Sequence, residues 1–196
     1  MSQNTEPAQT AKKGSFWKEL FWYAVFALVI VVPIRLWIAQ PFVVDGPSMN
    51  NTFANGQYLI VDEISYRFES PQRGDVLIFK YPLDTSKYFI KRVIGLPGET
   101  VSVDGSTVTI NGVKLNESYT GSQTFGKLTT TLTNDQYFVM GDNRLVSDDS
   151  RTWGPVPESD IVGTPIARLW PFNKINLWPG KVASSTMMSG STTSSN

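Results

Sequence analysis

The stretch Val-Ser-Val-Asp-Gly-Ser-Thr-Val-Thr-Ile-Asn-Gly-Val-Lys-Leu at residues 101–115 indicates the class of fold, because it places tight turns between short apolar runs. The turns are Asp104-Gly105, between runs at 101–103 and 107–110, and Asn111-Gly112, before a run at 113–115. Both dipeptides favour the two-residue turns of β-hairpins. We therefore predict antiparallel strands here.

On both sides of this stretch the chain continues in short runs rich in β-branched and aromatic residues, which are typical of strands. These runs are residues 58–61, 76–79, 89–94, 137–140 and 161–169. No long soluble helix and no internal repeat interrupts them. We predict a mainly β, antiparallel-sheet domain over residues 40–183, followed by a disordered Ser/Thr/Gly-rich tail at 184–196.

A long apolar run precedes the predicted β domain. Residues 20–39 contain a single charged side chain, Arg35, and about 20 apolar residues are enough to span a bilayer as a helix. Aromatic residues flank the run, as at membrane interfaces: Trp17, Trp22, Tyr23 and Trp37. A cleavable signal peptide would have a shorter apolar core and a small-x-small site, which is not found here.

The lysines before this run set the expected orientation. Lys12, Lys13 and Lys18 favour a cytoplasmic N-terminus. We predict a cytoplasmic tail at residues 1–18, one transmembrane anchor at 19–39, and the β domain of residues 40–183 on the extracytoplasmic side of the cell membrane.

The composition excludes several classes of function. The chain of 196 residues has 17 basic and 17 acidic residues, and no histidine or cysteine. A Ser-His-Asp triad, a Cys-His protease and a zinc site built on His or Cys are therefore impossible. A hydrolase of this composition would need a serine or threonine activated by lysine, a carboxylate pair, or a cation held by carboxylates.

Nucleic acid and nucleotides are not expected as partners. There is no basic stripe of the kind that binds nucleic acid. The glycine-containing turn at residues 95–98 lacks the Gly-Lys-Ser/Thr ending of a phosphate-binding loop. We expect no cofactor.

Three segments contain most of the candidate functional residues. They are Gly-Pro-Ser-Met-Asn-Asn-Thr-Phe at residues 46–53, Lys-Arg-Val-Ile-Gly-Leu-Pro-Gly-Glu at 91–99, and Gly-Asp-Asn-Arg-Leu-Val-Ser-Asp-Asp-Ser-Arg at 141–151.

Lys91 has the sequence context of a general base. In a strand it would share one face with Phe89 and Val93, where burial lowers the pKa of a lysine. A neutral lysine can then accept a proton near neutral pH. A strand lysine that reaches solvent is the commoner case, so this residue alone leaves both interpretations open.

Ser48 lies in a predicted turn after an apolar stretch. Such a turn exposes the hydroxyl and leaves backbone N–H groups free to stabilise an oxyanion. An ordinary turn serine is the alternative, and Ser48 alone does not decide between them.

The acidic residues of the third segment do not have the spacing of a calcium-binding loop. They are Asp142, Asp148 and Asp149. Arg144 and Arg151 supply counter-charges, so we expect a hydrogen-bonded ion-pair cluster and no metal.

Together the three segments resemble the bacterial type I signal peptidase family, in the family's order and spacing and after one anchor. The resemblance covers roughly residues 43–156. Ser48-Met49 with Thr52 is similar to the nucleophile motif, and residues 91–98 to the lysine motif. The third segment and the linking run 74–76 also fit.

The resemblance implies a role for each matching residue. Ser48 would be the nucleophile, with its N–H donating to the oxyanion, and Lys91 the general base. Ser147 would orient Lys91 through a hydrogen bond. The remaining roles would be a supporting Asp149–Arg151 ion pair, Asp142 and Arg144 shaping the same region, and Phe42, Val44 and Ile90 lining the substrate subsites.

The implied activity is the removal of signal peptides from exported preproteins, by cleavage after small residues of the Ala-x-Ala type through an acyl-enzyme. Both the preproteins and the lipid bilayer would be partners. The chain departs from the family at three positions: Asn51 stands where proline is usual, Glu99 where aspartate is usual, and Gly46 where some members carry a hydroxyl.

Three alternatives fit parts of the pattern. Repressor-type serine–lysine proteases cleave themselves but carry a DNA-binding domain and no anchor. Signal-peptidase-like proteins without the catalytic pair act as non-catalytic partners in the assembly of surface structures, whereas Ser48 and Lys91 are both present here. A generic anchored β domain leaves the three ordered motifs unexplained.

Overall fold

The computed structural model describes residues 13–33 and 39–188, which form two compact units divided between Ile38 and Ala39. The described part of the first unit is a single helix, α1 (Lys13–Pro33). No glycine or proline interrupts its sequence between Ser15 and Pro33, which favours a continuous helix.

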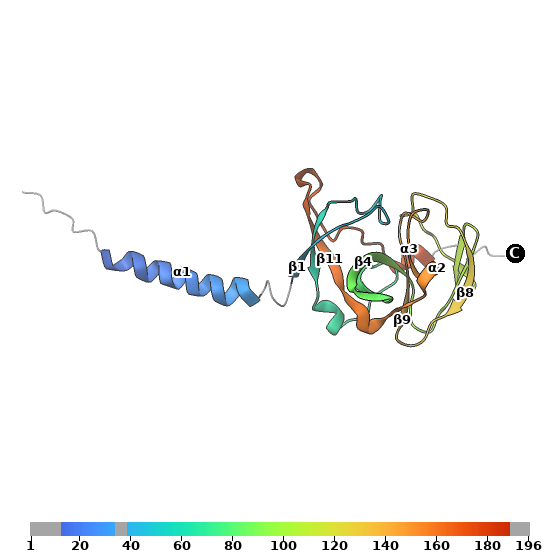
Figure 1. Ribbon diagram of the computed structural model, residues 1–196, viewed down its shortest axis with the longest axis horizontal. Coiled ribbons are helices and arrows are strands. Elements are labelled where there is room, and N and C mark those ends of the chain that lie inside the picture. The colour runs from blue at the N-terminus through green and yellow to red at the C-terminus, as the bar shows by residue number, and fades with distance from the viewer. Residues whose placement is uncertain (1–12, 34–38, 189–196) are drawn as a thin grey trace, which may run out of the picture. The chain divides into compact units, whose positions relative to one another are not determined.

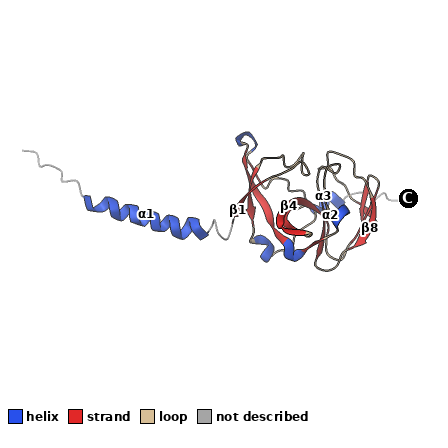
Figure 2. Ribbon diagram, viewed as in Figure 1, coloured by secondary structure: helices blue, strands red, loops and turns tan. Residues whose placement is uncertain are grey.

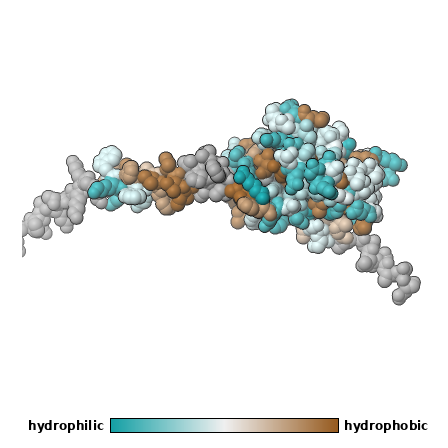
Figure 3. All heavy atoms as spheres, turned by 90° about the horizontal axis from the view of Figure 1, so that it is seen from below, coloured by the Kyte–Doolittle hydropathy of each residue, from teal (hydrophilic) through white to brown (hydrophobic). Residues whose placement is uncertain are grey.

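The helix α1 carries its charged residues near its start and exposes large apolar side chains from Phe16 to Ile30. Figure 3 shows this change from hydrophilic to hydrophobic along the helix. Among the described residues, no helix is long and apolar enough to cross a membrane. Residues 34–38 of the predicted span, with Arg35 and Trp37, lie outside the described residues.

The second unit consists of two antiparallel sheets with few helical residues (Figure 2). The larger sheet has the strand order β1-β2-β11-β3-β4-β9-β10, with β12 paired to β11. Its strands are β1 (Ala39–Val43), β2 (Tyr58–Asp62), β3 (Val76–Tyr81), β4 (Asp84–Gly95), β9 (Gln136–Met140), β10 (Val156–Pro157), β11 (Ile161–Trp170) and β12 (Asn176–Leu177). The predicted mainly β, antiparallel fold is confirmed.

The smaller sheet has the order β7-β6-β5-β8 and lies at the opposite end of this unit from β1 (Figure 1). Its strands are β5 (Thr100–Asp104), β6 (Thr107–Ile110), β7 (Val113–Lys114) and β8 (Lys127–Thr131). The predicted hairpin at Asp104-Gly105 is confirmed, because β5 and β6 pair from Asp104↔Thr107 onward.

Short helical turns connect the strands: η2 (Ser65–Arg67), α2 (Ser150–Trp153), η3 (Glu158–Asp160), η4 (Phe172–Lys174) and α3 (Ser184–Met188). The last of these corrects the expectation of a disordered tail from residue 184. Met187 of α3 is fully buried in the cluster that includes Val101, Ile110 and Phe138. Burial of this apolar side chain stabilises the helix against the sheet.

Two predicted boundaries also change. The helix α1 begins at Lys13, inside the segment predicted as a tail, and β1 begins at Ala39, the last residue of the predicted anchor. Two further hydrophobic clusters hold the large sheet, one around Phe79, Val93 and Val139 and one beneath the turn that follows β1.

Candidate active site

Ser48 lies in a turn that follows β1. The chain reverses at Gly46, whose φ of +90° is a conformation that glycine adopts readily. Met49, directly after Ser48, is fully buried in a cluster with Val44 and Phe53, and the Phe53 N–H donates to Met49 O at 2.7 Å. The buried methionine anchors the turn and leaves Ser48 half-buried.

Lys91 approaches Ser48 from β4. Its Nζ donates a hydrogen bond to Ser48 Oγ at a distance of 2.7 Å. The backbone of Lys91 pairs with Leu77 of β3, and its Nζ lies 5.2 Å from the centroid of the Phe89 ring. The structure therefore joins two residues that are far apart in the sequence into one hydrogen-bonded pair.

Burial changes the acid–base properties of this lysine. Only 4% of Lys91 is exposed. Loss of water lowers the pKa of its ammonium group from 10.5 to about 8, and the negative charges of Asp149, Asp148 and Asp142 oppose that change. A substantial fraction of Lys91 is then neutral at mildly alkaline pH.

The nucleophile turn is fixed by Asn143, a residue that the sequence analysis did not single out. The Asn143 N–H donates to Ser48 O at 2.9 Å, and its side-chain amide donates to Pro47 O at 3.2 Å. Among the described residues, the N–H of Ser48 itself has no hydrogen-bond acceptor. That N–H is free to donate to an incoming oxygen atom.

Ser48 and Lys91 line a cleft of about 540 Å³, called the apolar cleft below. The three residues expected to line substrate subsites, Phe42, Val44 and Ile90, all line it. Leu59 and Ile78 complete its apolar wall. Asp45, Val146 and Asp148 line it as well.

Ser147 is near the dyad, but the described residues contain no hydrogen bond between it and Lys91. Its Oγ is buried, and its hydroxyl helps to hold the pKa of Asp149 below its ordinary value. A Cβ at Gly141 would come within 2.2 Å of Ser147 Oγ and 2.5 Å of Ser48 O, so Ser147 and the nucleophile turn both pack against this glycine. The orienting role of Ser147 stays a prediction.

Asp149 and Arg151 form a two-pronged ion pair, with distances of 2.8 Å from Arg151 Nε to Asp149 Oδ1 and 2.8 Å from Nη2 to Oδ2. The Asp149 carboxylate also accepts from the N–H of Gly141 at 3.1 Å. Although burial opposes ionisation, the bonds and charge of Arg151 hold the pKa of Asp149 below its ordinary value. The pair thus fixes the segment that faces Lys91.

The partner of Asp142 differs from expectation. Arg144 was expected to supply a counter-charge in this region, but Asp142 pairs with Arg92, with 2.8 Å from Nε to Oδ1 and 2.6 Å from Nη2 to Oδ2. Both side chains are almost fully buried. The Thr52 hydroxyl also donates to Asp142. Thr52, Arg92 and Asp142 come from the three different motifs, which are therefore joined in one hydrogen-bonded network.

Arg144 instead pairs with Glu117, at 2.6 Å from Nη2 to Oε1, and donates to Thr124 at 2.6 Å. Neither partner lies in a motif, so a single sequence carried no signal for them. Arg92 and Thr52 do lie inside motifs, and this position was the only feature of the sequence that could have indicated their role in the site.

The departures from the family pattern have structural counterparts. Asn51 has a φ of +89°, a conformation that proline cannot adopt. The Gly46 N–H donates to Asn55 Oδ1 at 2.9 Å. Glu99 pairs with Arg73 and accepts from the Leu96 N–H at 2.7 Å, so it stabilises the turn of the lysine motif.

Comparison with known proteins agrees with this arrangement. A family model described as signal peptidase, peptidase S26, matches residues 17–170. Signal peptidase I of Leptolyngbya laminosa is 40% identical, over 76% of this chain and 77% of its own length. Probable signal peptidase I-2 of Synechocystis sp. is 35% identical over 90% and 86%, and signal peptidase I V of Bacillus subtilis 36% over 74% and 96%. Because the family model and these relatives match most of the chain, it belongs to the signal peptidase family, peptidase S26, and is a serine peptidase.

Proposed function

We propose that this chain is an endopeptidase that removes signal peptides from exported preproteins, with Ser48 as nucleophile and Lys91 as general base. The observation that carries the proposal is the 2.7 Å contact between Lys91 Nζ and Ser48 Oγ at the end of the apolar cleft. The lowered pKa of the buried Lys91, about 8, supports the same assignment, because a base must be neutral to accept a proton.

The first half of the reaction is acylation. Neutral Lys91 accepts the proton of Ser48 Oγ while Oγ attacks the scissile carbonyl carbon. The Ser48 N–H, free of other acceptors among the described residues, donates to the developing oxyanion. Collapse of this intermediate breaks the C–N bond, and the proton held by Lys91 passes to the departing amine.

The second half releases the signal peptide. Lys91, neutral again, accepts a proton from a water molecule that attacks the acyl carbon of the Ser48 ester. The ester bond breaks, the proton returns to Ser48 Oγ, and the signal peptide leaves as a carboxylic acid. The two halves use the same base, so one lysine serves both proton transfers.

The lining of the apolar cleft supports cleavage after small apolar residues. Its wall is formed by aliphatic side chains from four strands, including Leu59, Ile78 and Ile90. An extended substrate in this cleft runs beside β1 and β4, where it can form main-chain hydrogen bonds. We propose the Ala-x-Ala type of sequence as substrate, with Phe42, Val44 and Ile90 bounding the pockets.

We also propose that residues 19–39 anchor the protein in the cell membrane, with the N-terminus cytoplasmic and the β domain on the extracytoplasmic side. The described helix α1 supports this, since it has no charged residue after Glu19 and exposes apolar side chains such as Phe26 and Val29. A tethered enzyme and a membrane-bound preprotein share one surface, which raises their effective concentration.

The test is cleavage of an exported preprotein by the full chain in detergent, beside Ser48→Ala, Lys91→Ala and a matched lysine control, Lys127→Ala. We expect cleavage after an Ala-x-Ala sequence by the wild type and Lys127→Ala, and a loss of about a thousandfold or more in the other two. No cleavage by folded wild-type protein would favour the non-catalytic assembly partner. Cleavage by all four proteins would remove Ser48 and Lys91 from the mechanism.

A further inference from the structure

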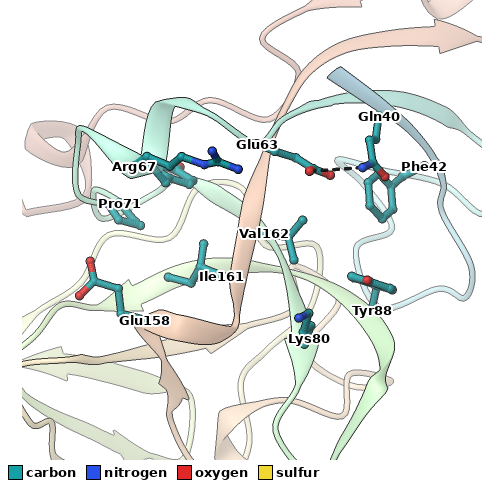
Figure 4. A pocket seen from close by; sticks show the side chains of 11 residues that line it. Gln40, Phe42, Glu63, Arg67, Pro71, Lys80, Tyr88, Glu158, Ile161 and Val162 are labelled. Atoms are coloured by element: carbon teal, nitrogen blue, oxygen red, sulfur yellow. Dashed lines mark hydrogen bonds between the residues drawn. The ribbon is translucent and has the colours of Figure 1, made fainter. Parts of the chain in front are cut away.

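A second cavity, the polar pocket, adjoins the apolar cleft. It has a volume of about 360 Å³ and seven polar or charged residues in its lining (Figure 4): Gln40, Glu63, Tyr66, Arg67, Lys80, Tyr88 and Glu158. Phe42 and Tyr88 line both cavities, and their ring centroids are 5.7 Å apart. The two cavities therefore meet at this aromatic pair.

The strands show that the two cavities lie next to each other along β3 and β4. On β3, Ile78 lines the apolar cleft and Lys80, two residues later on the same face, lines the polar pocket. Their partners on β4 are Ile90 and Tyr88. Along β3 and β4 the lining thus changes from the Ile78–Ile90 pair of the apolar cleft to the Lys80–Tyr88 pair of the polar pocket.

The polar pocket contains two acidic and two basic side chains, and among the described residues no ion pair joins them: Glu63, Glu158, Arg67 and Lys80. Glu63 accepts from Gln40 at 3.4 Å; partial burial raises its pKa, and the nearby Arg67 guanidinium acts in the opposite direction. Lys80 is half-buried and has no ion-pair partner among the described residues. Lys80 is the β3 partner of Tyr88, whereas Lys87, which precedes Tyr88 on β4 and lines the apolar cleft, is already paired with Asp84 at 3.0 Å.

We propose that the polar pocket is an upstream subsite for the preprotein, in which Lys80 favours an acidic or hydrogen-bond-accepting side chain over a basic one. This inference rests on the proposed function, which places the residues just before the cut in the apolar cleft. An extended peptide then continues past Phe42 and Tyr88 into the polar pocket. Lys80 acts there as a specificity-determining residue for the same cleavage.

The spacing of the strands indicates which substrate residue is involved. Side chains of an extended peptide that face the same way are about 6.6 Å apart, the same step that separates Ile78 from Lys80. If the first and third residues before the cut face the apolar cleft, the next residue on that side is about the fifth. The preference should therefore be strongest near this position.

The experiment uses the full chain in detergent and peptides with one Ala-x-Ala site that carry Asp, Asn or Lys at the fifth residue before the cut. We expect kcat/KM to be about two- to fivefold higher for Asp than for Lys, the range typical of one partly exposed charge pair. Lys80→Gln should abolish the difference and Lys80→Glu should reverse it.

Two controls separate this effect from general changes in charge. Lys127→Glu makes the same substitution on an exposed residue of β8 and should keep the wild-type preference. Peptides with Asp or Lys two residues after the cut should give the same ratio with wild type and Lys80→Glu. An unchanged preference at the fifth residue in folded Lys80→Glu would overturn the inference.

Binding keeps this test independent of turnover. The affinities of the same peptides, labelled with a fluorophore, are measured on the Ser48→Ala protein with and without Lys80→Glu. Cleavage without any dependence on the fifth residue would refute the upstream subsite and leave the proposed function intact. Charge-dependent binding without cleavage by the wild type would refute the proposed function and keep the subsite.

Discussion

At the scale of single residues, the position of Lys91 matters more than its type. Among the lysines that the structure describes, Lys91 is the one held at 2.7 Å from a serine hydroxyl and almost completely removed from water. The absence of histidine made a lysine base a natural candidate, and alternation along β4 indicated its buried face. Its contact with Ser48 is long-range and could not be read from the sequence without the family resemblance.

The pH dependence of cleavage follows from this burial. Because the pKa of Lys91 is lowered to about 8, the neutral base is present above that pH and lost below it. We expect kcat/KM for a short peptide to rise about tenfold per pH unit below pH 8 and to level off above it. Steady-state rates across this range test the prediction.

Lys91→Arg is the control for the pH profile. A guanidinium stays protonated throughout this range, so the variant should be inactive at every pH. A wild-type profile without an inflection near pH 8, or turnover by Lys91→Arg, would contradict the role of Lys91 as base.

Asn51 gives a second prediction at this scale. Its φ of +89° lies far from the value near −65° that proline requires, and its amide packs against Gly121. Asn51→Pro should therefore destabilise the fold by about 3 kcal/mol or more, although proline is usual at this position of the family. Asn51→Gly is the matched control in urea unfolding, because glycine adopts a positive φ readily. Equal stability of the two variants would show that the turn adapts to proline.

At the scale of elements, hairpins were the best-predicted feature. The Asp-Gly and Asn-Gly turns specify β5, β6 and β7 through local backbone preferences, and runs rich in β-branched and aromatic residues located β2, β3 and β9. Other strands were missed for physical reasons. The strand β8 is mainly threonine and forms because β5 pairs with it, and β1 follows an apolar run that hides its start.

The ion pairs around Asp142 likewise could not be predicted from a single sequence. Arg92 lies 50 residues from Asp142, and one sequence contains no information about which distant charges will pair. Arg92 also donates to Gly74 O at 2.7 Å and to Gly180 O at 2.6 Å. One buried guanidinium thus joins β4, the segment after β9, and the chain beyond β12.

Removing one charge from this network should be costly. We expect Asp142→Asn to reduce the free energy of unfolding by about 3 kcal/mol or more, because Arg92 would remain buried without a counter-charge. Urea denaturation followed by tryptophan fluorescence measures the change. Asp84→Asn, in the exposed pair with Lys87, is the matched control and should leave stability unchanged. Similar losses in both variants would mean that burial of the Arg92–Asp142 pair is unimportant.

At the scale of the whole molecule, the β unit contains its own cores and its own site. All three hydrophobic clusters consist of residues after Ala39, and so do Ser48, Lys91 and the lining of both cavities. The described residues of the helical unit, 13–33, add none of these groups. Its proposed contribution is confinement to the membrane surface, which acts on the encounter with the substrate and leaves the chemistry unchanged.

This division predicts how a chain of residues 39–196 should behave. It should fold, since its buried cores are complete. It should also cleave a short soluble peptide with a kcat/KM within about twofold of the full chain, because such a peptide reaches either protein by diffusion through solution. Preprotein embedded in lipid vesicles should be cut at least about tenfold more slowly by the shortened chain, because the shared surface is lost.

The full chain with Ser48→Ala, added to the same vesicles, controls for cleavage by contaminants. Equal rates on vesicles would remove the anchor from the mechanism, whereas a loss on the soluble peptide as well would mean that the first 38 residues support the catalytic unit itself.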